Sequence, residues 1–391
     1  MEVKQIYKLI NSVSSEVLGK ADIVAEDLTG VVDLGTEIFN QGAVDNYVKS
    51  LVNHIGKVIF VNRPYAGKIP SVLMDAWEFG SVLEKISADV PEATENDTWN
   101  LTDGQEYKQD IFHKPVVSAK FFNSKVTFEV PVSITERQVK ESFSSAAQLN
   151  GFLSMIYAAV EKSMTIKTDA LIMRTINNMV GETLFADEAA FTGTGKAVNY
   201  GSNSTVRCVN LLYLYNQAKG ATLTADKCLT DGDFIRFASY QMGLYADRLQ
   251  SISTLFNVGG KERFTPKDSL HTVLLSDFAK GAQAYLYADT YNKEQVLLPN
   301  AETVASWQGT GNDYGFAHTS AINITTSGKH AINIGGVLGV MFDRDALGVC
   351  NLDKRVTTNY NAKAEFFNNY YKFDAGYFND TNENFVVFFV A

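Results

Sequence analysis

Two glycine-rich stretches come nearest to a phosphate-binding motif, and each lacks a residue that the motif requires. TGTGKA, residues 192–197, contains the Gly-Lys pair of the phosphate loop G-x-x-x-x-G-K-[ST]. However, Ala190 stands where that loop has its first glycine, and Ala197 where it has the hydroxyl that binds magnesium. In INIGGVLG, residues 332–339, Ile334 replaces the first glycine of a dinucleotide fingerprint. We therefore expect a surface loop and a strand rather than two nucleotide sites.

The other residue types that carry chemistry form no recognisable constellation. The sequence has no G-x-S-x-G nucleophile motif and no H-E-x-x-H metal motif, and its histidines form no i,i+4 pair. Asp343, Asp345 and Asp353 are interpreted as solvated residues of turns and strand ends. We therefore predict no catalytic residues, no cofactor-binding residues and no metal ligands. The five histidines are His54, His113, His271, His318 and His330.

The cysteines point to a reducing compartment. Cys208, Cys228 and Cys350 are an odd number of thiols without a short spacing, so they indicate neither a disulfide framework nor a thiolate metal site. The N-terminal stretch has an acid at position 2 and no uninterrupted apolar core, which is not the pattern of a secretory signal. No run of 18 apolar residues occurs, so no membrane-spanning helix is predicted.

Length, composition and charge bound the class of protein. At 391 residues the chain exceeds one ordinary core, and its 46% hydrophobic and 20% charged residues are typical of a folded protein. The net charge of −10 argues against tight binding of nucleic acid, because such affinity comes largely from Lys and Arg that replace counterions. A loose enclosure of nucleic acid remains compatible with this charge.

The longest helical pattern runs from Thr135 to Gly181. Thr135 and Gln138 match a capping box, and Asn150-Gly151 predicts a break. Beyond the break, residues 152–181 contain no proline and carry apolar residues at helical spacing, with Gly181 suited to a left-handed C-cap. These apolar positions include Phe152, Ile156, Val160, Met164, Leu171 and Ile176.

The region before this helix predicts an arm, a helix and a long excursion. Residues 41–57 form an amphipathic pattern that ends at Gly56, and a strand follows at 58–62. Between residues 74 and 130, two strand-like arms flank the polar centre 89–110, which predicts a two-stranded excursion. Because an isolated hairpin has too little face to bury, we expect it to pack on something else, for which a neighbouring subunit is one candidate.

The region after residue 206 has a mixed α/β texture that turns to strands near the end. Helices are predicted at 209–220, 230–250 and 277–289, with a strand at 271–276. Further strands are predicted at 321–326, 330–343 and 383–390. No fixed-period repeat is visible, which disfavours solenoids and propellers.

The last 52 residues carry the most specific pattern in the chain. They contain Asp343-Arg344-Asp345-Ala346, then RVTTNYN at 355–361, and an aromatic strand at 385–389. This order resembles the closing segment of major capsid proteins of tailed double-stranded DNA phages. DNYVKSLVNHIGKVIFV, residues 45–61, also resembles a piece of the small podovirus shell proteins of the phi-twenty-nine group.

The resemblance implies an α+β chain with the Hong Kong 97 shell fold. Residues 1–40 would be an N-terminal arm, 63–132 an extended loop that reaches over a neighbour, and 209–340 an α/β axial domain. The peripheral domain would combine 41–62 and 133–208, which include the long spine helix, with closing strands at 341–391.

The resemblance also implies partners and a location. Copies of the chain would form pentamers and hexamers of an icosahedral shell in the virion, assembled in the bacterial cytoplasm around loosely held double-stranded DNA. A portal and scaffolding or decoration proteins would be further partners, and no membrane is involved. Some relatives crosslink subunits through lysine, but no local pattern marks Lys108, Lys114 or Lys120 as reactive, so we predict no crosslink.

Two alternatives stay open at the level of sequence. An encapsulin-like compartment would use the same fold to hold protein cargo. An α/β enzyme with an unrecognised site would instead have a deep pocket with perturbed carboxylates.

Overall fold

A computed structural model of the chain shows a mixed α+β protein. It describes residues 72–74, 83–88, 90–91, 93–107, 110–135, 146–287, 298, 300–307 and 321–391, together with Asn11 and Ser15. The expected arm at 1–40, the helix at 41–57 and the strand at 58–62 therefore lie outside the described residues, apart from those two.

The chain divides into two compact units. Unit 1 comprises Met1–Ala76, Lys125–Ile172 and Val349–Gly376, and unit 2 comprises Trp77–Ser124, Met173–Gly348 and Tyr377–Ala391. The domain boundaries expected from the resemblance stay a prediction.

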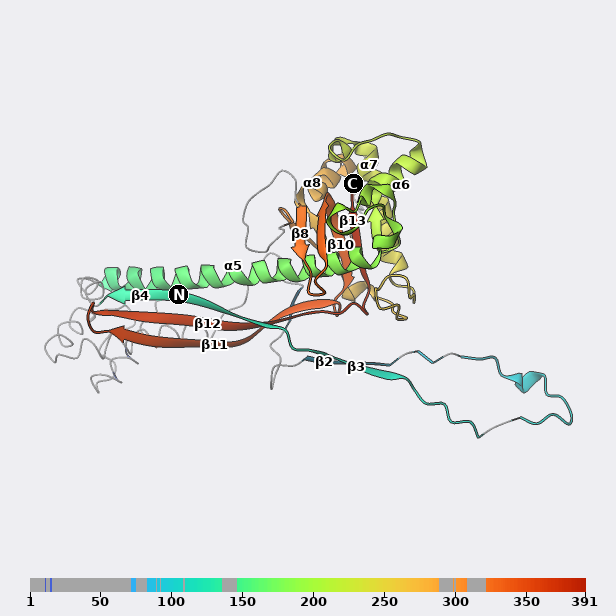
Figure 1. Cartoon of the computed structure of the whole chain (residues 1–391), viewed down its shortest axis with the longest axis horizontal. Coiled ribbons are helices and arrows are strands. Elements are labelled where there is room, and N and C mark those ends of the chain that lie inside the picture. The colour runs from blue at the N-terminus through green and yellow to red at the C-terminus, as the bar shows by residue number, and fades with distance from the viewer. Residues whose placement is uncertain are drawn as a thin grey trace. The chain divides into compact units, whose positions relative to one another are not determined.

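The long helix forms, but its two ends differ from the prediction. Helix α5 runs through Ala146–Ala186, 41 residues, without a break at Asn150-Gly151 (Figure 1). At 1.5 Å per residue it is about 60 Å long. A glycine inside a helix costs only about 1 kcal/mol, which a helix of this length tolerates. Thr135 is the last residue of strand β4, and Gln138 lies outside the described residues.

Gly181 does not end this helix, because it serves close packing instead. The helix continues for five residues beyond it, and a Cβ atom at this position would lie 2.5 Å from Thr326 Cγ2. Thr326 follows strand β8 (Ala321–Thr325), which pairs with β9 (Ala331–Gly335) in an antiparallel hairpin. The missing side chain therefore allows the hairpin to approach the helix.

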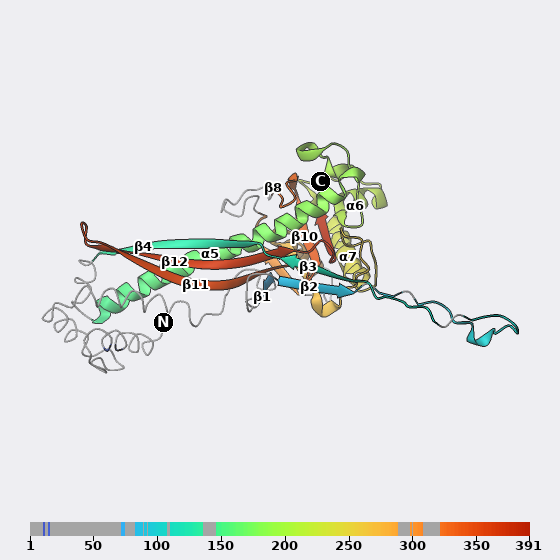
Figure 2. The same ribbon diagram turned by 60° about the horizontal axis from the view of Figure 1, so that its bottom comes forward.

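Unit 1 contains a sheet of four strands in the order β1-β11-β12-β4. Long antiparallel pairing joins β12 to β4, from Phe366 opposite Thr135 to Gly376 opposite Lys125. Exposed residues alternate with partly buried ones along β4, and partly buried residues with buried ones along β12, as expected for a sheet with one covered face. Strands β4, β12 and β11 run side by side in Figure 2. The strands are β1 (Leu73–Met74), β4 (Lys125–Thr135), β11 (Leu347–Asn361) and β12 (Phe366–Asn379).

Unit 2 is built on a five-stranded mixed sheet in the order β5-β13-β10-β6-β7. Every residue of the central strands β13, β10 and β6 is buried, which agrees with their largely apolar sequences. The strands are β5 (Cys208–Asn210), β6 (Leu270–Leu275), β7 (Ala301–Val304), β10 (Val337–Asp343) and β13 (Phe385–Phe389).

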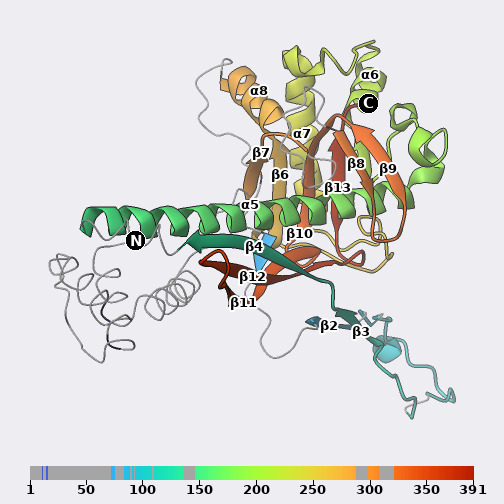
Figure 3. The ribbon, with the colours of Figure 1, turned by 60° about the vertical axis from the view of Figure 1, so that its left-hand side comes forward.

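Three helices accompany this sheet, grouped together in Figure 3. Two of these helices have capped ends: Asp231 accepts a hydrogen bond from Phe234 N at the start of α7, and Gly220 ends α6 with φ +61°. The helices are α6 (Leu211–Lys219), α7 (Gly232–Arg248) and α8 (Ser276–Tyr287). Short 3-10 turns lie at Glu188–Ala190, Gly195–Ala197, Tyr200–Ser202, Cys228–Thr230 and Lys267–Ser269.

The single strand expected at 330–343 is instead two strands. The chain turns between β9 and β10 at Gly336, whose φ of +71° is unfavourable for residues with a side chain. A Cβ atom there would also collide with Val390 O. Gly336, which lies inside the single predicted strand, is therefore the residue at which the chain passes from the β8–β9 hairpin into the five-stranded sheet.

The predicted two-stranded excursion is confirmed as strands β2 (Leu83–Ala88) and β3 (Val117–Phe122), which pair antiparallel (Figure 1). We call residues 83–122 the extended loop. The second predicted arm is divided, because the chain from Lys125 onward forms β4 and pairs with β12. The polar centre 89–110 contains seven acidic residues and one lysine, a net charge of −6. The acidic residues are Asp89, Glu92, Glu95, Asp97, Asp103, Glu106 and Asp110.

We expect the variant Gly181→Ala to lower the free energy of unfolding. Alanine gains about 1 kcal/mol of helix propensity, but the overlap with Thr326 Cγ2 costs roughly 1–3 kcal/mol. Adding Thr326→Ser removes that methyl group and keeps the hydroxyl that accepts from His330 N, so the double variant should recover. Urea denaturation of the three proteins tests this, and a Gly181→Ala variant more stable than the parent would contradict it.

Candidate functional site: the root of the extended loop

Two lysines face each other at the root of the extended loop. Lys85 on β2 and Lys120 on β3 are directly opposite in the strand pairing. Like charges in such positions destabilise a strand pair unless an anion lies between them. Asp380 supplies it: its Oδ2 lies 3.0 Å from Lys85 Nζ and its Oδ1 lies 2.8 Å from Lys120 Nζ.

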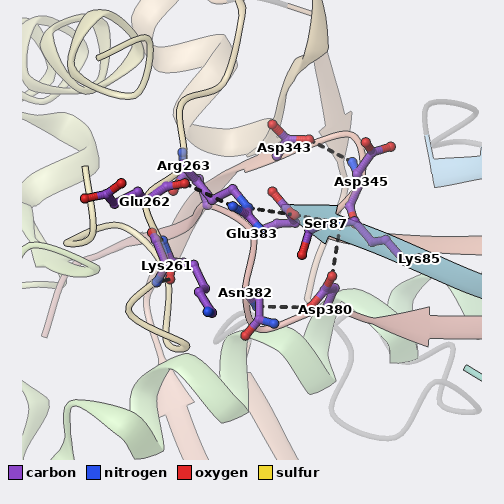
Figure 4. A network of polar contacts seen from close by, with 12 residues as sticks. Lys85, Ser87, Lys261, Glu262, Arg263, Asp343, Asp345, Asp380, Asn382 and Glu383 are labelled. Atoms are coloured by element: carbon purple, nitrogen blue, oxygen red, sulfur yellow. Dashed lines mark hydrogen bonds and ion pairs between the residues drawn. The ribbon is translucent and has the colours of Figure 1, made fainter. Parts of the chain in front are cut away.

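A second carboxylate extends this cluster. Glu383 Oε1 lies 2.7 Å from Lys85 Nζ and 3.2 Å from Arg263 Nε. Lys85 Nζ also donates a hydrogen bond to the backbone oxygen of Asp345, at 3.2 Å. We call the five side chains that form these ion pairs the ionic joint, and Figure 4 labels four of them, Lys85, Arg263, Asp380 and Glu383. The five are Lys85, Lys120, Arg263, Asp380 and Glu383.

The carboxylates come from one tightly held turn between β12 and β13. Asp380 N donates to Ala346 O at 2.7 Å, and Asp380 Oδ1 accepts from Asn382 N at 3.0 Å. Gly259 N donates to the backbone oxygen of Thr381 at 2.9 Å. The turn that carries the carboxylates is therefore held by hydrogen bonds that do not involve the loop.

The lysines reach this turn because they lie on the inner face of the two loop strands. Residues of β2 alternate between partly buried and exposed, and Lys85 is on the partly buried side. Lys120 shares its face with Phe122, whose ring lies 5.1 Å from that of Phe378. An aromatic contact thus lies beside the ionic joint.

Burial and charge act in opposite directions on the joint. Burial favours the neutral form of Lys85, but the hydrogen bond to Glu383 and the charges of both carboxylates outweigh it and raise the pKa. Burial likewise favours the neutral form of Asp380, whose side chain is 2% exposed. The hydrogen bond from Lys120 and the charge of Lys85 nevertheless lower its pKa. The ion pairs therefore persist over a wide pH range.

The sequence interpretation of the three aspartates needs one correction. Asp343 is buried, and its Oδ1 accepts a hydrogen bond from Asp345 N at 2.9 Å. Burial raises the pKa of Asp343. Asp345 and Asp353 are exposed, as expected, and Asp353 lies 3.2 Å from Arg355 Nη1. The position of Asp343 at the end of the buried strand β10 explains the difference.

The glycine-rich stretches carry no free cluster of amide donors. Gly195 N donates to Glu188 Oε1 at 2.6 Å, so the chain's own carboxylate takes the place that a phosphate would need. Residues 332–339 belong to β9, the turn at Gly336 and β10. Neither stretch contains a residue of the ionic joint.

The histidines are scattered in the structure as in the sequence. His330 Nδ1 lies 3.2 Å from Glu182 Oε2, His271 is buried beside Phe342, and His113 is exposed. His54 and His318 lie outside the described residues. Within the described part of the chain, no group of three or more His, Cys, Asp or Glu residues is arranged to hold a metal ion.

Neither the cysteines nor the described loop lysines, for which we predict no crosslink, are marked as reactive groups by their surroundings. The three cysteines are buried and form no disulfide, and burial raises the pKa of Cys228 to about 11. Lys120 is paired with Asp380, Lys114 is exposed, and Lys108 lies outside the described residues. The prediction that no crosslink forms stays a prediction.

A groove of 440 Å³ lies beside α6 and α7. Its lining contains no carboxylate and no histidine, which are the side chains that most often act in general acid-base catalysis. It is lined by Ser204, Thr205, Val206, Leu214, Ala218, Phe237, Gln241, Tyr245 and Arg248. Across the described residues, no helix is both long and apolar enough to span a bilayer.

Sequence reasoning did not find the ionic joint. Lys85 and Lys120 stand at inward positions of two alternating strands, which is an unusual place for a charge and the signal that could have marked them. No local pattern connects them to Asp380, because 260 positions separate Lys120 from it.

The sequence model of one protein family, described as Phi29-like phage major capsid protein, matches residues 10–389. The chain belongs to this family. The assignment confirms the resemblance inferred from the closing segment and decides in favour of a phage major capsid protein over an encapsulin. The role of such proteins is structural, which agrees with the expectation that the chain is not an enzyme.

Comparison with individual proteins agrees with the family. The major capsid protein of Bacillus phage B103 is 22% identical over 206 residues, which are 51% of this chain and 44% of that relative. The match therefore spans a little under half of the relative's length.

Two solved structures have a similar arrangement. A chain in the structure of the head fiber and inner core protein gp22 of native bacteriophage P68 has a TM-score of 0.50 at 8% identity, over 85% of this chain and 86% of that one. A chain in the capsid structure of Staphylococcus phage Andhra has a TM-score of 0.49 at 10% identity, over 84% and 86%. At these identities the first likeness concerns the fold alone.

We expect Asp380→Asn to destabilise the capsid protein by about 3 kcal/mol at pH 7. This is the lower end of the range for breaking a buried pair, because Lys85 keeps Glu383 and Lys120 is more than a third exposed. The matched control Asp353→Asn, at an exposed ion pair, should change stability by less than about 1 kcal/mol.

The pH dependence of this difference has a defined sign. Asp380 has a lowered pKa in the folded state, so its contribution is present above the ordinary carboxyl pKa and is lost as pH falls through the lowered value. The gap between the parent and Asp380→Asn, measured by urea denaturation, should therefore be constant from pH 5 to 8 and shrink below pH 3.8. Equal destabilisation by both asparagine variants would contradict the prediction.

Proposed function

We propose that this protein is the subunit of an icosahedral shell that self-assembles and encloses phage double-stranded DNA. The observation that carries the proposal, beside the family assignment, is the extended loop with its unburied apolar side chains. Trp99 is 94% exposed, Phe112 86% and Leu101 67%. Clustered apolar exposure of this kind marks a surface that binds another protein.

The loop needs that partner for a physical reason. A two-stranded ribbon has too few cross-strand contacts to be stable alone in water, and edge strands with unpaired backbone groups tend to pair with other chains. In a shell, a second copy of the same chain supplies a partner for every loop. The extended loop at 63–132 of our expectation would then reach over a neighbour, as the resemblance implies.

The finer architecture that we propose is that of the Hong Kong 97 fold. Helix α5 would be the spine of the peripheral domain, 209–340 the axial domain that gathers in pentamers and hexamers, and 341–391 the closing strands. The order of elements supports this assignment, since α5 is followed by the α/β part and then by β11, β12 and β13.

The charge of the subunit suits a container that holds DNA loosely. A net charge of −10 disfavours the counterion release on which tight phosphate binding depends. Assembly in the host cytoplasm, with a portal and scaffolding or decoration proteins, belongs to the same proposal. Nanomolar affinity of the isolated subunit for DNA at low salt would contradict the loose contact.

We expect the purified protein, alone or with a scaffolding protein, to form shells visible by negative-stain imaging and size analysis. The double variant Trp99→Ser with Phe112→Ser should form few or none, because it removes the most exposed apolar side chains of the loop. Its unfolding midpoint should equal that of the parent, since exposed side chains contribute little to stability.

The conservative double variant Trp99→Tyr with Phe112→Tyr is the matched control, and it should retain most of the assembly. Shells from the serine variant at the parental yield would show that these side chains do not carry the contact. A parent protein that remains a monomer under all conditions, with scaffold supplied, would overturn the proposed function.

A further inference from the structure

We propose that the ionic joint sets the direction in which the extended loop projects from the rest of unit 2, and thereby positions the loop for contact with a second copy of this chain. Only the contact with a second copy rests on the proposed function. The direction of the loop is a property of the single subunit and can be measured there.

The fixed contacts of the loop are concentrated at its root. Every side chain described between residues 90 and 116 is exposed. The hydrogen bonds of this stretch are local, as from Thr102 N to Tyr107 Oη at 2.9 Å. At the root, by contrast, Lys85 and Lys120 reach carboxylates that come from a different part of unit 2. The root is therefore where the path of the loop is decided.

The length of the loop magnifies the effect of any rotation at its root. From Ala88 to Leu101 the chain can extend by about 45 Å, taking roughly 3.4 Å per residue as an upper limit. A rotation of about 10° at the root would then displace the far end by about 8 Å, which is more than a side-chain contact tolerates. A loop that docks on a neighbour thus needs a root with one orientation.

The contacts of the ionic joint restrain the direction of the loop as well as its distance from the turn that carries Asp380 and Glu383. Asp380 uses one oxygen for each lysine, so it is held between the two loop strands. Glu383 binds Lys85 and Arg263 with the same oxygen, which ties the loop to the segment before Thr265. The neighbouring contact between Phe122 and Phe378 is apolar and tilted, and such a contact alone would allow sliding.

A buried ion pair can be replaced by apolar residues without loss of stability, and this separates positioning from folding. The triple variant Lys85→Met, Lys120→Met, Asp380→Leu removes three charges together and leaves Glu383 paired with Arg263. We expect it to keep the parental unfolding midpoint and to lose the fixed orientation of the loop. The variant Lys85→Arg with Lys120→Arg keeps the charges and should keep the orientation.

The test on the single subunit is a distance measurement between two spin labels. Val117→Cys lies on β3 near the root and Tyr240→Cys on α7, both exposed and both in unit 2. The native cysteines are buried, so the labels attach to the introduced thiols. We expect a narrow distance distribution in the parent and in the arginine variant. The methionine-leucine variant should give a distribution at least twice as wide, and the control Asp353→Asn the parental width.

Two results on the subunit would overturn the proposal. One is a distribution that is already broad in the parent. The other is an unchanged narrow distribution in the methionine-leucine variant. Neither depends on whether shells form.

The assembly arm then tests the consequence. We expect the methionine-leucine variant to give at least tenfold fewer shells than the parent, and the arginine variant to recover them. Shells at the parental yield from a variant with a broadened distribution would overturn the link between the joint and assembly. Failure of the parent to assemble would instead contradict the proposed function and leave the spin-label result intact.

Discussion

The burial of strand β13 is the constraint on which the rest of unit 2 depends. All five of its residues are buried between β5 and β10, and its aromatic rings contact rings from three other segments. Each fully buried phenylalanine contributes about 1.5–3 kcal/mol, so the strand cannot shift without a large loss. The turn before it carries Asp380 and Glu383, and its position is restrained because it is joined directly to this buried strand. The carboxylates of the ionic joint are thus fixed by the apolar core rather than by their own ion pairs.

The side chains of the extended loop are far more exposed than those of β13. None of the loop's described residues is fully buried, Leu83 and Phe122 are partly buried, and its largest apolar side chains lie in solvent. If the loop binds a neighbouring copy, as we propose, stability and association are carried by different residues of the same unit. This separation explains why changes in the loop can be designed to affect assembly while leaving folding intact. It also explains why the ionic joint matters, since it connects the part that folds to the part that binds.

The fold was predictable from the sequence where the signals are local. Asp231 before α7 and Gly220 after α6 mark helix ends through backbone groups only a few residues away. Gly181 shows the limit, because a glycine that ends a helix and one that admits a neighbouring hairpin look the same in sequence. The same limit applies at Asn150-Gly151, where the length of the helix overrode two unfavourable residues. The buried state of Asp343 was missed for a related reason, since its environment is made by distant strands.

The candidate site was less predictable than the fold. Family membership could be inferred from the closing segment, because that pattern is continuous in the chain. The ionic joint joins residues that are 260 and more positions apart, and charge pairing across such distances leaves no mark in a single sequence. The strand alternation of β2 and β3 places both lysines inward, yet it does not name their partners.

The acidity of the loop has a consequence for how subunits meet. Its centre, residues 89–110, carries −6 of the −10 net charges, so the remainder of the chain carries about −4. Two approaching loops repel each other over a Debye length, about 30 Å at 0.01 M salt and about 8 Å at 0.15 M. In the proposed shell, contact between subunits through this loop would therefore meet less electrostatic repulsion at 0.15 M salt than at 0.01 M.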